Sequence, residues 1–156
     1  MADMKTRVAL LTVVTALALP AAAAAKTYSL AGKFEDPAAT ISLKVKVNKK
    51  GKPVSVSKVA AKNIRFRCPA PVPGLSDIEG RRDSTAPGTL TVSYLKRTKQ
   101  YIFRKTFALP GGGNAKVFGV VSKNGKKVSS GDLSLNFKQQ GLGCANAVGT
   151  WTAKKK

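Results

Sequence analysis

The stretch TISLKVKVNKKGKPVSVSKV, from Thr40 to Val59, alternates apolar and polar residues on both sides of a glycine-containing turn. Its first half separates into an apolar set (Ile41, Leu43, Val45 and Val47) and a polar set (Ser42, Lys44 and Lys46). Alternation with a period of two residues is typical of a strand that buries one face. The segment NKKGK between the two halves is a turn signal. The stretch therefore predicts a β-hairpin with an apolar inner face and a lysine-rich outer face.

The same alternation recurs along the rest of the chain. It is found in KNIRFRC from Lys62, TLTVSYL from Thr89, QYIFRKTFAL from Gln100, AKVFGVV from Ala115, DLSLNF from Asp132 and GTWTA from Gly149. Convincing helical periodicity is confined to the first 25 residues. The chain is thus predicted to form an all-β domain, an antiparallel β-sandwich or open barrel of about 8–10 short strands.

The N-terminus has the organisation of an export signal. Lys5 and Arg7 precede the apolar run 8–19, and an Ala-x-Ala motif ends at Ala25. The run is shorter than the roughly 20 residues that span a bilayer. We expect residues 1–25 to be cleaved, leaving residues 26–156 as a single domain without a transmembrane span. The expected location is secreted, either extracellular or associated with the cell wall.

The chain is strongly basic, with 28 Lys and Arg against 7 Asp and Glu. Without the leader it keeps 26 basic (28 minus 2) and 6 acidic (7 minus 1) residues, a net charge of +20. No acidic residue occurs in 37–76 or in 84–131. Such a charge favours contact with anionic polymers. The candidate anion-binding residues are Lys44, Lys46, Lys49, Lys50, Lys52, Arg65 and Arg67. A solvated strand face and turn would account for the same lysines without a ligand.

Two cysteines remain, Cys68 and Cys144. An even number of cysteines in an exported protein favours a disulfide. A free reactive thiol and a metal site are the alternatives, but the chain has no histidine and two thiols alone are a poor zinc site. We expect Cys68 and Cys144 to form a structural disulfide.

The segment 69–88 interrupts the alternating pattern, because it is rich in proline and glycine. It is predicted to be a long loop, and long loops in small domains are usually functional or mobile. A solvated excursion held at one end by the disulfide is the alternative.

The sequence contains one internal echo. VNKKGKPVS from Val47 and VSKNGKKVS from Val121 agree at six of nine positions. A duplication would place the two turns at equivalent points of two similar halves. Recurrent Lys-Gly turns in a lysine-rich β protein would explain the echo equally well.

Composition argues against catalysis and cofactors. Without histidine, Ser-His-Asp and Cys-His arrangements are excluded. A glycosidase carboxylate pair would have to come from scattered acids, and these are more often caps and salt-bridge partners. A calcium site from Asp77, Glu79 and Asp83 lacks EF-hand spacing and is interrupted by Arg81 and Arg82. We expect no enzymatic activity, no cofactor and no metal.

Aromatic residues offer a second kind of candidate site. Tyr101, Phe103 and Phe107 are spaced for one face of a strand, where they would stack on sugar rings if exposed or join the core if buried. Basic residues among them would also suit single-stranded nucleic acid, but export makes nucleic acid an unlikely partner.

A cysteine near the end of an early strand is followed by a Gly-Lys-x-Val hairpin, a Ser-Gly-x-Leu-x-Leu strand and a C-terminal Gly-x-Cys…Gly-Thr arrangement with Trp. The matching residues are Gly125, Lys126, Val128, Gly131, Leu133, Leu135, Gly143, Cys144, Gly149 and Trp151. With these features, much of the chain after the expected leader resembles a broad group of small secreted bacterial all-β proteins of unassigned function. The resemblance implies export and a β-sandwich, and it implies no activity.

Two functions are compatible with these observations. The first is a secreted binding module for anionic or carbohydrate material of the cell envelope. The second is a structural or protein-interaction domain, such as a scaffold or inhibitor, whose charge serves solubility. Oligomeric state does not follow from the sequence.

Overall fold

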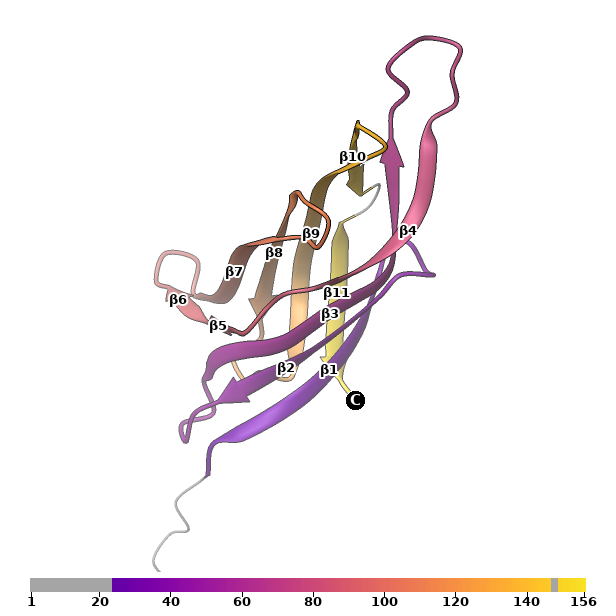
Figure 1. Cartoon of the computed structure of the whole chain (residues 1–156). Coiled ribbons are helices and arrows are strands. Elements are labelled where there is room, and N and C mark those ends of the chain that lie inside the picture. The colour runs from indigo at the N-terminus through magenta and orange to yellow at the C-terminus, as the bar shows by residue number, and fades with distance from the viewer. Residues whose placement is uncertain (1–23, 147–148) are drawn as a thin grey trace, which may run out of the picture.

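The computed structural model of the protein describes residues 24–146 and 149–156. The expected export signal lies outside these residues except for Ala24 and Ala25. Eleven strands and no helix occur in the described part of the chain (Figure 1). The strands are β1 (Lys26–Phe34), β2 (Thr40–Val47), β3 (Pro53–Cys68), β4 (Ile78–Thr85), β5 (Thr89–Thr91), β6 (Ser93–Leu95), β7 (Gln100–Ala108), β8 (Asn114–Val121), β9 (Lys127–Gln139), β10 (Leu142–Asn146) and β11 (Thr150–Lys155). The all-β prediction is confirmed, with more strands than expected because two of them are only three residues long.

The strands form one antiparallel sheet around two long members, β3 and β9. β3 pairs with β2 along its first part and with β10 through Phe66 and Arg67. β9 pairs with β11 near its start and with β10 near its end. The path β3–β2–β1–β11–β9–β10 therefore returns to β3, so that six strands form a closed ring. β8, β7 and β6 extend the sheet beyond β9.

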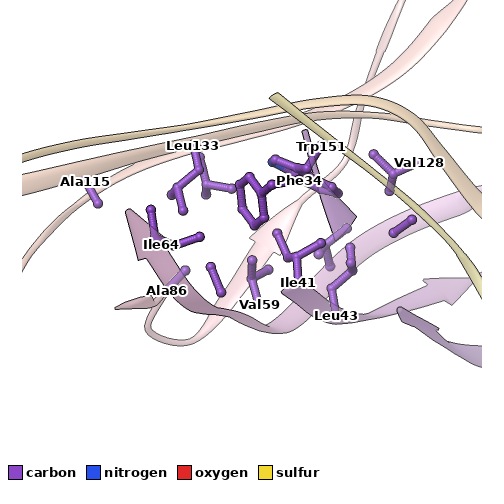
Figure 2. Close-up of a cluster of buried hydrophobic side chains, with 14 of the residues drawn as sticks. Phe34, Ile41, Leu43, Val59, Ile64, Ala86, Ala115, Val128, Leu133 and Trp151 are labelled. Atoms are coloured by element: carbon purple, nitrogen blue, oxygen red, sulfur yellow. The ribbon is translucent and has the colours of Figure 1, made fainter. Parts of the chain in front are cut away.

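The hydrophobic core lies inside this curved sheet. Figure 2 shows side chains of β1–β3, such as Ile41 and Val59, facing side chains such as Ala115 and Leu133 of β8 and β9. The inward sets of β2 and β9 are all buried, as the alternation predicts. Trp151 is 2% exposed. It packs against Gly131, where an added Cβ would overlap the indole ring.

The predicted disulfide is confirmed. Cys68 ends β3, Cys144 lies on the neighbouring β10, and the two sulfur atoms are bonded. Both residues are buried, at 0% and 2% exposed. The bridge therefore crosses the point where β10 joins β3 to β9.

The prediction of a loop over residues 69–88 is wrong for its second half. Residues 78–85 form β4, which pairs with β3 from Ala60–Thr85 to Cys68–Ile78. The sequence did not predict this strand because its residues show no apolar alternation. Backbone pairing to β3 holds it in place. Gly80 has no side chain and leaves room for the ring of Phe66. Only the tip, residues 69–77, projects beyond the sheet (Figure 1).

The two echo segments form similar turns. In the β2–β3 turn, Asn48 Oδ1 accepts hydrogen bonds from the N–H groups of Lys50 and Lys52, at 2.9 and 3.0 Å. In the β8–β9 turn, Asn124 Oδ1 accepts one from the Lys126 N–H at 3.1 Å. Each turn has its glycine in the left-handed region, at a φ of 73°. Residues 48–52 and 122–127 are called the lysine turns below.

Candidate anion-binding site

A strongly basic surface lies on the outer face of β3, β2, β1 and β11, with the start of β9. Strand alternation directs the apolar side chains of these strands into the core and their lysines to the solvent. The outward lysines are Lys33, Lys44, Lys46, Lys62, Lys127, Lys154 and Lys156. We call this set the basic sheet face.

Strand register sets the positions of these lysines. Ala60, Ser42, Ala31, Lys154 and Lys127 are successive partners across β3, β2, β1, β11 and β9. With strands about 4.8 Å apart, this row spans about 19 Å. In the next outward row Lys62 pairs with Thr40, which pairs with Lys33. Neighbouring rows are about 7 Å apart, so lysines surround a centre made of small residues.

A shallow groove of about 880 Å³ lies over this centre. Its floor contains Ala31, Ser42 and Ala60, with the backbone of Gly32 exposed between strands. Five lysines line it: Lys33, Lys62, Lys127, Lys154 and Lys156. Thr40, Ser42 and Thr152 add hydroxyl groups to the lining of the groove.

Carboxylates are few on this face. Three of the six in the described residues are on the β3–β4 hairpin (Asp77, Glu79 and Asp83), two are in the β1–β2 turn (Glu35 and Asp36), and Asp132 is on β9. Two carboxylates border the face: Asp132 pairs with Thr150, two residues from Thr152, and Glu35 lines a small cleft together with Lys33. Most of the negative charge is thus gathered toward one end of the molecule, and the basic sheet face keeps an excess of positive charge.

Arginines neutralise part of the acidic end. Arg81 Nη1 lies 2.8 Å from Asp36 Oδ2, and Arg65 Nη2 lies 2.7 Å from Glu79 Oε2. The Ala38 N–H and then Arg81 lower the pKa of Asp36. The hydrogen bond from Arg65 to Glu79 raises the pKa of the guanidinium. These arginines are therefore occupied within the chain.

The same end holds the acids weighed above as calcium ligands. Asp77 accepts hydrogen bonds from the Ala70 N–H and from Arg67, and these contacts lower its pKa. Asp83 accepts a hydrogen bond from the Asn63 N–H at 2.9 Å. Each carboxylate has its own partner, and no group of three or more His, Cys, Asp or Glu in residues 24–146 and 149–156 is placed to hold a metal ion.

The lysine turns lie next to each other at the opposite end. A cleft of about 460 Å³ between them is lined by Lys50, Lys52 and Lys123 together with Gly51, Ser122 and Asn124. Gly125 packs against Val47, which joins the second turn to the end of β2. The positive charge of the sheet face thus continues onto this end of the molecule.

The structure divides the predicted anion-binding residues into three groups. Lys44 and Lys46 belong to the basic sheet face, with Lys44 half-buried. Lys49, Lys50 and Lys52 lie on the first lysine turn. Arg65 and Arg67 are on the other end of β3, roughly 40 Å from the turn, where each forms an ion pair. Arg65 and Arg67 therefore do not cluster with the lysines, because the length of β3 separates them.

The predicted stacking aromatics do not form a surface. Tyr101, Phe103 and Phe107 are 9%, 1% and 7% exposed and belong to the core. The exposed-platform alternative is wrong for them, because the outward positions of β7 hold the residues between them. Tyr94 is the exposed tyrosine next to this strand, at 49%.

Several groove lysines were missed by the sequence analysis, namely Lys33, Lys62, Lys127, Lys154 and Lys156. Their alternation with buried residues was visible, but the groove also depends on the pairing of β1 with β11, the first and last strands of the described residues. No local pattern signals that pairing.

In comparisons with known proteins, no family model, curated protein or solved structure matches the chain. Within the described residues, no helix has the length and apolar character needed to cross a bilayer.

Proposed function

We propose that the protein is a non-enzymatic binding module that holds anionic polymers of the cell envelope on its basic sheet face. The observation that carries the proposal is the segregation of charge: seven outward lysines share one sheet face, whereas among the described carboxylates only Glu35 and Asp132 border it. A surface that served solubility alone would mix both signs.

Binding of this kind is driven by counterion release. A polyanion that contacts five lysines displaces its condensed cations. For a flexible strand, the slope of log K against log salt concentration is about −0.7 for each contact. Raising the salt fourfold would then weaken binding about a hundredfold. The lysine turns lie beside the face and would engage neighbouring units of a long chain.

The disulfide supports a location outside the cytoplasm, because such bonds persist in oxidising compartments. We infer secretion, with cleavage near Ala25, from this bond together with the N-terminal pattern. We also infer a barrel-like architecture rather than a sandwich, because β10 pairs with both β3 and β9.

A protein-interaction role is the second candidate. Val72 and Leu75 are 53% and 62% exposed at the projecting tip of residues 69–77. Exposed apolar residues on a protruding loop are typical of contacts with another protein. This role would leave the lysines without a ligand.

A charge-matched pair of variants tests the proposed function. In the face variant Lys33, Lys62, Lys127 and Lys154 become Gln. In the control Lys96, Arg97, Lys99 and Lys138, all exposed and away from the face, become Gln. With about 0.5 kcal/mol per exposed contact, the face variant should bind heparin or polygalacturonate about 30-fold more weakly in 100 mM salt. The control should change affinity by less than about threefold. Equal losses in both variants would refute the site.

A further inference from the structure

The groove in the basic sheet face is more than a charged plane. A volume of about 880 Å³ is within the range of about 300–1,000 Å³ typical of sites for discrete ligand units. A flat lysine face would be enough for a bare polyanion. The groove also has room for a discrete ligand unit that carries the charges.

The chemistry of the groove indicates which kind of ligand unit it accepts. Its floor is formed by the methyl groups of Ala31 and Ala60 and by the strand backbone at Gly32. Ser42 lies between the two alanines, and Thr40 and Thr152 lie on either side of Lys33 in the next outward row. Alkyl stems of lysines cover apolar surface while their ammonium groups stay in water. The groove thus combines apolar contact, hydroxyl hydrogen bonding and positive charge at its rim.

We propose that this groove is a subsite for the sugar ring of an anionic glycan, a hexose unit that bears a carboxylate or sulfate. The ring lies on the methyl floor, its hydroxyls hydrogen-bond to Ser42 and the two threonines, and its anionic group meets a rim lysine. The inference rests on the proposed function and adds to it the class of polymer. A phosphate chain without rings would use the lysines and leave the floor empty.

The small size of the floor residues is not required by packing. Ala31, Ser42 and Ala60 point outward, so a larger side chain at these positions would fill the groove without entering the core. This permits a test in which the charge is unchanged. Ser42→Leu and Ala60→Leu each fill the floor, and Ser134→Leu makes the same kind of change at an exposed outward position of β9.

The experiment compares two ligands of similar charge, a tetragalacturonate and a short inorganic polyphosphate, in titrations at 50 mM salt. The filled variants should bind tetragalacturonate at least tenfold more weakly and polyphosphate within threefold of wild type. Ser134→Leu should match wild type for both ligands. Urea midpoints within error of wild type establish that the variants are folded.

Two results would overturn the inference, and they differ in what else they affect. If the filled variants bind both ligands like wild type, the sugar subsite is wrong and the polyanion-binding face stands. If wild type binds neither ligand, the proposed function fails together with the subsite.

Discussion

Removing the disulfide should cost the protein a large part of its stability. The bond closes a loop with a sequence separation of 76 residues. The loop-closure relation gives an entropy loss of the unfolded chain worth about 4.5 kcal/mol at 25 °C. Domains of this size have unfolding free energies of about 5–15 kcal/mol, so the loss is a third or more of the total. β10 is only five residues long, and the bond fixes it to β3 where the six-strand ring closes.

Urea unfolding of wild type and of the double variant Cys68→Ala, Cys144→Ala measures this effect. With a slope of about 2 kcal/mol per molar urea, the midpoint should fall by about 2 M. The urea midpoint of wild type in reducing agent should fall by a similar amount. This control separates loss of the bond from loss of the buried sulfur atoms. Identical midpoints for oxidised wild type, reduced wild type and the variant would show that the disulfide does not stabilise the fold.

Three further predictions concern packing and acid stability. Gly131→Ala should lower the unfolding free energy by about 1–3 kcal/mol, because the added methyl group would overlap the Trp151 ring. Gly143→Ala is the control: its methyl group would meet open space, so the same denaturation assay should show almost no change. Phe103→Ala should lower the unfolding free energy by about 3–5 kcal/mol, because Phe103 is buried. At a temperature where the variant is folded, its affinity for anionic glycan should equal that of wild type. Loss of affinity would instead indicate a stacking role for Phe103. Because the folded-state pKa of Asp36 is lowered, its contribution to stability is present above about pH 4 and is lost as the pH falls through the folded pKa. Asp36→Asn should therefore destabilise the protein at neutral pH and reduce the dependence of the midpoint on pH below 4, and an unchanged acid profile would contradict the ion pair.

Local alternation was sufficient to predict much of the sheet. The inward residues of β2 and β9 and the inward position of Cys68 follow from a period of two, because the core must take every second side chain. The disulfide followed from cysteine number and expected compartment. β4 could not be predicted in this way, since backbone pairing and ion pairs rather than apolar burial hold it in place.

The candidate site was predictable only in part. Lys44 and Lys46 were recognised because they share a strand with buried valines. The groove depends on which strands become neighbours, and the β1–β11 pair brings Lys33 beside Thr152 from opposite ends of the chain. Arg65 and Arg67 show the converse: they follow the lysines closely in sequence, but an extended strand carries them to the other end of the molecule.

The central claim is that the basic sheet face is where anionic polymer binds. Backbone amide shifts recorded by nuclear magnetic resonance during titration with an anionic oligosaccharide test it most directly. We expect the largest shifts on β1, β2 and β11 around Ala31, Ser42 and Lys154, with weaker shifts at the lysine turns. Shifts concentrated at the tip of residues 69–77 or around Lys96–Lys99, or shifts spread evenly over all basic residues, would contradict it.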